Sequence, residues 1–99
     1  MEGHIAENYF FTLLKKEFQY VSFYRTRDKE FDFVAANNLR DKGEYQYFEV
    51  KYSNQLKEKD FRFIAKEAKK KGKGYTIISK GTLEFGENRT ILPIWAIRE

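Results

Sequence analysis

Apolar residues recur along the first part of the chain at the spacing of one helix face. They stand at positions 5, 6, 9, 10, 13, 14 and 18, which predicts a helix from Ile5 to Phe18. Gly3 is then expected just outside the start of this helix. Glu7 falls in its first or second turn, near the positive end of the helix dipole.

A second segment repeats the helical spacing later in the chain. Its apolar residues stand at positions 61, 64, 65 and 68, within a stretch that we expect to be helical from about Lys57 to Lys71. Gly72 and Gly74 follow directly and are typical of a helix end.

Five segments rich in aromatic and β-branched residues predict strands, at 20–27, 31–36, 45–52, 75–79 and 90–97. The first two are separated by the turn Arg27-Asp28-Lys29-Glu30 and form a predicted hairpin. Pro93 favours an edge position for the last strand, because proline cannot donate to a ladder. The order α-β-β-β-α-β-β predicts an α/β fold over 1–99, one domain with a mixed sheet flanked by helices.

Two predicted strands carry charged residues where burial is expected. In the third strand Phe48 and Val50 should face one side of the sheet, whereas Glu49 and Lys51 share the other. The second strand has Asp32 inside an apolar run. Charged side chains are rarely buried unless they are paired or bind a metal, so these positions form a candidate site.

Composition narrows the chemistry that such a site can have. The chain has no cysteine and a single histidine, which excludes thiolate sites and leaves a hard cation such as Mg²⁺ or Mn²⁺, bound by carboxylates. Such an ion lowers the pKa of a bound water, and a neighbouring lysine can orient that water or neutralise phosphate charge. No apolar run approaches the length of a membrane span, so we expect no membrane contact and a cytoplasmic protein.

Three short motifs in the sequence resemble those of a known family. They are Gly3-His4-Ile5-Ala6-Glu7-Asn8, Glu30-Phe31-Asp32-Phe33 and Phe48-Glu49-Val50-Lys51-Tyr52. Together they resemble the PD-(D/E)XK superfamily, which includes type II restriction enzymes and archaeal Holliday-junction resolvases. More narrowly, with Phe23-Tyr24-Arg25 and Leu92-Pro93-Ile94, the chain is similar to the nuclease-like C-terminal domain of archaeal and bacterial AAA-type ATPases of unknown function.

The resemblance implies a restriction-endonuclease-like core and a role for each matched residue. Asp32 and Glu49 match the metal-binding acids, Lys51 the catalytic lysine, and Glu7 the acid of the first helix, a ligand directly or through water. The main-chain carbonyl of Val50 is implied as a further ligand. The resemblance therefore implies a Mg²⁺- or Mn²⁺-dependent endodeoxyribonuclease acting on duplex or structured DNA. The alternative is a catalytically inactive module that binds DNA or protein within an AAA-type ATPase.

Further contacts are predicted around this site. The net charge is +4, and the segment 57–73 alone has eight Lys or Arg residues against three acids. Phosphate binding or a solvated helix end both explain this excess. The candidate DNA contacts are Lys66, Lys69, Lys70, Lys71 and Lys73. Gln55 follows the third strand where some resolvase relatives place a glutamine that touches the site, and such relatives often dimerise, so a homodimer is a further expectation.

Simpler explanations apply to several of these residues. Asp32 and Glu49 can pair with Lys51, or with Arg25 and Arg27, as a structural ion-pair network. His4 is expected to be an exposed terminal residue. The aromatic residues at 45, 47, 52, 61 and 63 are explained by core packing or by a base-stacking surface, and those at 85 and 95 by a partner contact.

Overall fold

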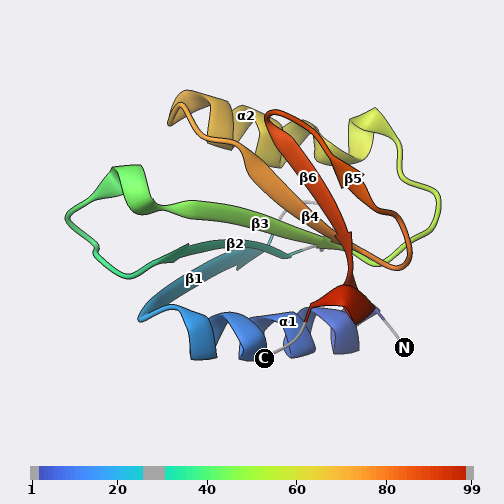
Figure 1. Ribbon diagram of the computed structural model, residues 1–99, viewed down its shortest axis with the longest axis horizontal. Helices are drawn as coiled ribbons and strands as arrows, with labels where there is room; N and C mark the ends of the chain where they lie inside the picture. The colour runs from blue at the N-terminus through green and yellow to red at the C-terminus, as the bar shows by residue number, and fades with distance from the viewer. Residues whose placement is uncertain (1–2, 26–30, 98–99) are drawn as a thin grey trace.

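Two helices lie on opposite faces of a mixed β-sheet in the computed structural model, which describes residues 3–25 and 31–97 (Figure 1). The elements are α1 (Gly3–Glu17), β1 (Tyr20–Arg25), β2 (Phe31–Ala36), β3 (Gln46–Lys51), α2 (Arg62–Lys70), β4 (Tyr75–Ser79), β5 (Glu84–Phe85) and β6 (Arg89–Pro93), with short 3₁₀ helices η1 (Lys42–Glu44), η2 (Glu58–Phe61) and η3 (Ile94–Ala96). The described residues form one six-stranded sheet in the order β1-β2-β3-β4-β6-β5. The predicted α/β fold is confirmed.

The crossover from β3 through α2 to β4 fixes the two ends of the sheet. β3 pairs with β4 and β4 with β6 in parallel, whereas β1–β2, β2–β3 and β5–β6 are antiparallel. Strands β3, β4 and β6 therefore end at one edge, which we call the carboxyl edge, where β2 begins. Their starting ends form the amino edge. In an α/β sheet the carboxyl edge is where ligands usually bind.

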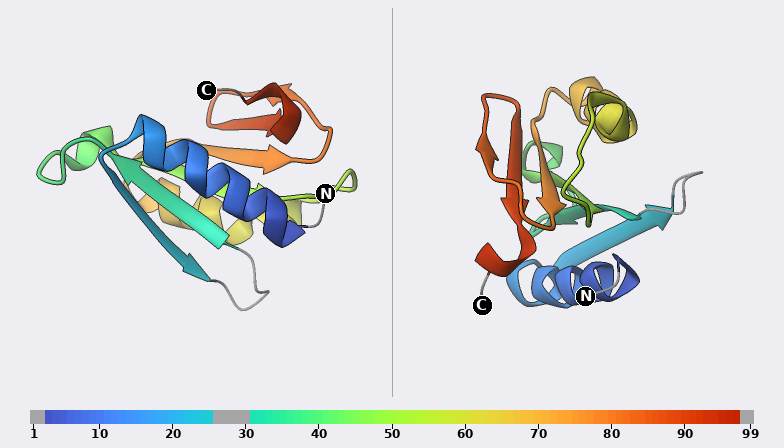
Figure 2. Two further views of the ribbon diagram at one scale, coloured as in Figure 1. Left: turned by 90° about the horizontal axis from the view of Figure 1, so that it is seen from below. Right: turned by 90° about the vertical axis from the view of Figure 1, so that its right-hand side faces the viewer.

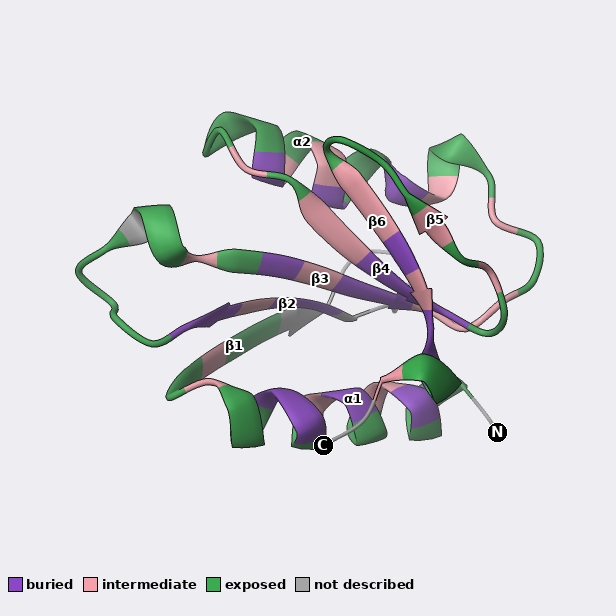
Figure 3. Ribbon diagram, in the orientation of Figure 1, coloured by how far each residue is buried: buried purple, intermediate pink, exposed green. Residues whose placement is uncertain are grey.

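Each helix buries an apolar stripe against its own face of the sheet (Figures 2 and 3). On the α1 face, the Phe10 ring meets the Phe33 and Phe48 rings edge-on, with centroids 5.6 and 5.4 Å apart. Ala6, Leu14 and Val50 belong to the same buried cluster. A second cluster, on the α2 face, contains Tyr47, Phe61, Ile64, Ala68, Ile77 and Ile91.

The predicted helix ends are partly corrected. α1 begins at Gly3 itself, not after it. In the second segment the turn at 58–61 is 3₁₀, so α2 proper is shorter than predicted. Gly72 ends it with φ 67°, where the Gly72 and Lys73 amides donate to the Lys69 and Ala68 carbonyls at 3.0 and 2.9 Å.

The last predicted strand is wrong in its place and its length. β6 is not an edge strand, because the two-residue strand β5 pairs with it at Thr90 and Ile91. Pro93 is its final residue, beyond the end of the β5 ladder, so the missing N–H breaks no pairing on that side. The chain then turns into η3 instead of continuing as a strand to 97. β5 was not predicted, since two residues are too few to show alternation.

Candidate metal and nuclease site

Asp32 and Glu49 face each other across two neighbouring strands. In the β2–β3 ladder they are directly paired, a position where Cβ atoms stand about 4.5–5.5 Å apart. Their neighbours Phe33 and Phe48 pack toward α1, and Tyr47 packs toward α2. Because side chains alternate along a strand, Asp32, Glu49 and Lys51 all project from the α2 face near the carboxyl edge. The predicted pairing and facing of these residues are confirmed.

Both carboxyl groups are removed from solvent. Asp32 is 1% exposed and Glu49 2%. The Lys51 ammonium lies 4.0 Å from Glu49 Oε1, with a side chain that is itself only 10% exposed. Neither carboxylate oxygen of Asp32 receives a hydrogen bond within the part of the chain that the structure describes. A buried carboxylate in this condition is costly, because nothing replaces the water that it has lost.

The electrostatics of Asp32 follow from this burial. Burial raises the pKa of Asp32 from 3.8 to about 7, opposed by the hydrogen bond that the Glu49 carboxyl can form with it once the pair holds a proton, and reinforced by the charge of Glu67 on α2. The hydrogen bond to Glu49 needs a proton on one of the two groups, since two carboxylates have no donor between them. Near neutral pH the pair therefore favours either a shared proton or a bound cation.

Glu7 lies at the same edge of the sheet but on its other face. α1 begins at the carboxyl edge and runs toward the amino edge, where β1 starts, so its first turns lie at the same edge as the acids. There Glu7 is half-buried and lines a cavity of 150 Å³ with Asn8, Phe11, Phe23 and Phe33. Among the described residues no three or more His, Cys, Asp or Glu side chains form a group suited to a metal. The structure therefore brings together two of the three predicted acids.

The predicted DNA-binding lysines lie away from these acids. α2 runs from the carboxyl side toward the amino edge, so Lys69 and Lys71 in and after its last turn are at the far end of the sheet (Figure 1). Lys70 pairs with Glu67 at 3.6 Å, and the Lys73 ammonium donates to the Gly43 carbonyl in η1, which precedes β3. Lys66, one turn earlier, is exposed. Lys69, Lys70, Lys71 and Lys73 therefore lie toward the amino edge, not beside the carboxylate pair.

The other residues singled out in the sequence lie outside the carboxylate pair. Gln55 is exposed in the loop after β3, where its backbone N–H donates to the Ser53 hydroxyl at 3.0 Å, so it does lie at the carboxyl edge. His4 is exposed, as expected. Arg27 and Glu30 lie outside the described residues, as does the predicted hairpin turn.

The aromatic residues divide between core and surface. Tyr47 and Phe61 are buried in the cluster under α2, which confirms core packing for them. Phe63 is 44% exposed, and Phe85 and Trp95 are 78% and 67% exposed.

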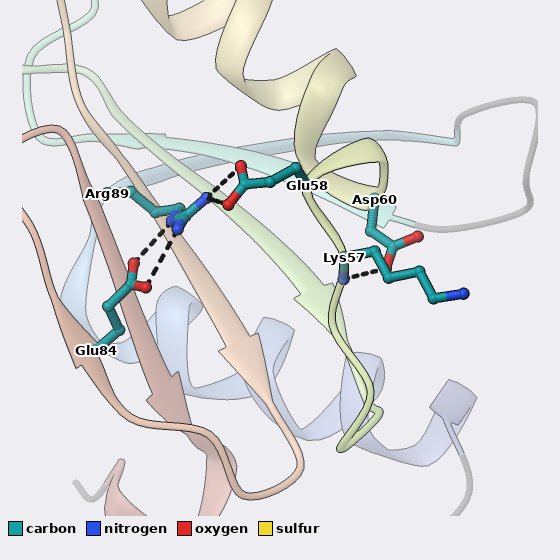
Figure 4. Close-up of polar contacts among 5 residues, drawn as sticks. All are labelled: Lys57, Glu58, Asp60, Glu84 and Arg89. Carbon is teal, nitrogen blue, oxygen red and sulfur yellow. Dashed lines mark hydrogen bonds and ion pairs between the residues drawn. The ribbon is translucent and has the colours of Figure 1, made fainter.

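A second charged cluster was missed by sequence reasoning (Figure 4). Arg89 at the start of β6 donates to Glu84 through Nε and Nη2 at 2.8 and 3.1 Å, and through Nη1 to both Glu58 oxygens at 3.0 and 2.9 Å. Its guanidinium carbon also lies 5.1 Å from the centre of the Phe61 ring. The hydrogen bond with Arg89 lowers the pKa of Glu84, and the two carboxylates raise that of Arg89. Glu84 is five residues from Arg89, across the turn between β5 and β6, and Glu58 is 31 residues away, so no helical or strand periodicity relates the three residues.

Comparison with known proteins adds a family assignment. The model of one family, described as a domain of unknown function (DUF4143), matches residues 2–97. The chain matches no curated protein and no solved structure. In the described parts of the chain, none of the helices has the length and apolar character that crossing a membrane requires.

Proposed function

Since the chain belongs to the DUF4143 family of domains of unknown function, we propose its activity from the site itself: a divalent-metal-dependent DNA nuclease. It hydrolyses phosphodiester bonds, in duplex or structured DNA, at the site formed by Asp32, Glu49 and Lys51. The sequence motifs favour the PD-(D/E)XK superfamily, and the strand pairing of Asp32 with Glu49 is what that superfamily's chemistry needs.

Asp32 carries this proposal. Both of its oxygens are buried and receive no hydrogen bond from the described residues, a state that costs on the order of 1–3 kcal/mol. A fold that kept Asp32 only for stability would be expected to supply it with donors, as it supplies Glu84. The described side chains of the pair and of Lys51 sum to one net negative charge if all are ionised, so a cation suits the site.

The donor set fits a hard divalent cation. Two carboxylates provide oxygen ligands of the kind that Mg²⁺ and Mn²⁺ prefer, and Asp32, Glu49 and the Val50 carbonyl would hold the ion. Such an ion supplies charge stabilisation and a more acidic bound water. Glu7, at the same edge but on the other face, would contribute through water, not as a direct ligand.

Lys51 has a defined part in this chemistry. Its side chain is on the same strand face as Glu49 and is largely buried, so its ammonium is held close to the acids. There it can orient an attacking water by hydrogen bonding and neutralise negative charge that develops on the phosphate. Rotamer freedom is small for so buried a side chain, which keeps this group positioned before substrate arrives.

A cleavage assay tests the proposed activity. Purified protein with Mn²⁺ is incubated with duplex, flap, four-way and single-stranded DNA, beside Asp32→Asn as a variant of equal size. We expect cleavage of at least one form by the wild type and none by Asp32→Asn. Cleavage of no form, or equal cleavage by both proteins, would refute the proposal. Circular dichroism of both proteins confirms that each is folded.

One observation favours a second function, an inactive module that binds DNA or protein. Asp32 and Glu49 are 1% and 2% exposed, so a scissile phosphate reaches them only if covering segments move aside. In this case we expect DNA or a partner protein to bind equally well to wild type and Asp32→Asn, without cleavage. Either way, the narrower resemblance leads us to propose that the domain works in the cytoplasm with an AAA-type ATPase domain in the same chain; a homodimer stays a prediction.

A further inference from the structure

A lysine that was not among the predicted DNA contacts, Lys80, lies in a loop at the carboxyl edge. Lys51 at the end of β3 is the register partner of Ser79 at the end of β4. Lys80 follows Ser79 directly, so it is the first residue beyond the end of this ladder, as Tyr52 is on β3. Lys51 and Lys80 therefore lie at the same edge on neighbouring strands, Lys51 on the α2 face and Lys80 over Tyr52, which packs against the α1-face cluster.

Lys80 is exposed, yet the structure fixes where it lies. Its ammonium stands 5.5 Å from the centre of the Tyr52 ring, a cation–π contact. The turn that carries it is closed by Ser79, which is fully buried: its hydroxyl accepts from the Thr82 amide at 3.0 Å and donates to the Thr82 carbonyl at 2.8 Å. A surface lysine placed in this way loses less entropy on binding an anion than a free one.

The two loops of this edge also pack against each other. A Cβ added at Gly81 would stand 2.9 Å from the Asn54 side-chain oxygen, so the turn after β4 approaches the loop after β3 closely. That second loop carries Gln55 and is itself closed by the Ser53 hydroxyl. The edge beside the carboxylate pair is therefore a pre-formed surface, with a lysine at a set position.

A substrate phosphate needs such a cation here. The carboxylate pair repels the DNA backbone, and this repulsion must be offset close by, since charges separated by more than about 8–10 Å are screened at physiological salt. Lys69, Lys70 and Lys71 lie near the end of a nine-residue helix, about 13 Å along its axis from its start. They are at the amino edge, whereas Lys80 is at the carboxyl edge itself.

We propose that Lys80, placed by Tyr52 and the Ser79–Thr82 turn, is the positioning residue that binds a backbone phosphate next to the scissile one. This assignment rests on the proposed nuclease function and replaces the α2 lysines as the main phosphate contact. The ligand is a phosphodiester backbone, read through its charge, so Lys80 contributes affinity and register, not base specificity.

Binding of a fluorescein-labelled duplex, followed by anisotropy in EDTA over a series of salt concentrations, tests the assignment. Lys80→Met removes the charge and keeps an apolar stem over Tyr52. We expect it to weaken binding about 3- to 10-fold and to reduce the slope of log K against log salt by roughly one, the value for one phosphate contact. Lys80→Arg should restore both.

The matched control is the triple variant Lys69→Ala, Lys70→Ala, Lys71→Ala, which removes three charges at the far edge. We expect a smaller change in affinity than Lys80→Met causes. The assignment is overturned if the triple variant loses a slope of two or more while Lys80→Met binds like wild type. It is equally overturned if wild type shows no salt-dependent binding.

Measurement in EDTA separates this inference from the nuclease itself, because binding then requires neither metal nor cleavage. DNA binding that depends on Lys80, without cleavage in Mn²⁺, would refute the nuclease and leave the phosphate contact. Cleavage that is intact in Lys80→Met, with unchanged KM, would refute the contact and leave the nuclease. Where both hold, Lys80→Met should raise KM more than it lowers kcat.

Discussion

Two charged clusters lie on the α2 face of one sheet, and they are built in opposite ways. Arg89 is matched by two carboxylates, Glu84 and Glu58, with four hydrogen bonds of 2.8 to 3.1 Å. Those acids remain 41% and 82% exposed at their side chains. Asp32 and Glu49 are almost fully buried, and they face each other. The first cluster has its donors and acceptors satisfied, whereas Asp32 in the second does not.

The difference indicates what each cluster is for. The Arg89 cluster joins the β5–β6 pair to η2, an element outside the sheet that no ladder of the described residues connects to these strands, so it closes the C-terminal part of the sheet onto the second helical segment. The carboxylate pair joins β2 to β3, which their ladder already holds together. Two buried carboxylates at this position repel each other and connect no further elements of the fold. Buried charges that destabilise a fold and hold no elements together are expected where a protein binds a ligand or catalyses a reaction.

Loss of the Lys51 ammonium should produce the largest effect. In the proposed nuclease, Lys51→Ala lowers the cleavage rate on the order of 100-fold or more, because charge on the phosphate loses a positioned cation. The measurement is a single-turnover cleavage rate in Mn²⁺. Lys51→Met, which keeps the buried stem, should be as inactive as Lys51→Ala; an active Lys51→Met would show that the charge is not what matters.

Replacing Asp32 should stabilise the fold, the reverse of the usual effect of a core substitution. Burial raises the pKa of Asp32 to about 7, so between about pH 4 and pH 7 the folded state keeps a proton that the unfolded state has lost. The free energy of unfolding therefore falls as the pH rises through that window, and Asp32 makes no further difference above it. Asp32→Asn cannot ionise, and its amide can donate to Glu49.

We expect Asp32→Asn to gain roughly 1–3 kcal/mol over wild type at pH 8, without metal, and little at pH 4. Urea unfolding at both pH values measures the gain. The difference between Asp32→Asn and wild type is taken at each pH, because groups common to both proteins then cancel. A loss of stability at pH 8 would show that Asp32 is satisfied after all and that the contrast between the clusters is false.

Breaking the satisfied cluster should have the opposite sign and a smaller size. Arg89→Ala removes the cation between the two acids and the stem that packs on Phe61, and should cost about 1–2 kcal/mol. Arg89→Met keeps most of the stem, so the difference between the two variants in urea unfolding gives the share due to packing. No loss in either variant would mean that β5 and β6 are held by their ladder alone.

The smallest effect is expected at Glu58, whose side chain is 82% exposed. Glu58→Ala should lower Tm by about 2 °C or less, and 0.5 M NaCl should remove that change, because exposed ion pairs are weak and screened. Glu87→Ala, an exposed glutamate in the turn between β5 and β6, serves as the control. A drop as large as that of Arg89→Ala would place the main contact at Glu58.

Helical and strand periodicity were sufficient to predict most of the fold. The strands 31–36 and 75–79 have the predicted bounds, and the facing of Glu49 and Lys51 followed from alternation. The predictions failed where a segment is too short to show a hydrophobic periodicity. β5 is only two residues long, and it moved Pro93 from an edge strand to an inner one.

The positions of site residues on strands could be predicted from the sequence, whereas the positions of the lysines on α2 could not. Asp32 and Glu49 are in ladder register, which two neighbouring strands determine. The direction of α2 across the sheet decides which lysines approach the acids, and this depends on the crossover, not on local spacing. Lys80 could not be predicted for the same reason, since only the β3–β4 register places the end of β4, and with it Lys80, at the same edge as Lys51.

Metal binding by Asp32 and Glu49 is the property on which the proposed nuclease site most directly depends. Mn²⁺ is titrated into metal-free protein and followed by electron paramagnetic resonance and by thermal unfolding. We expect one tightly bound Mn²⁺ per wild-type chain, a Tm that rises with Mn²⁺ concentration, and neither effect in Asp32→Asn. Wild type that binds no Mn²⁺, or Asp32→Asn that binds it equally well, would contradict the proposed site.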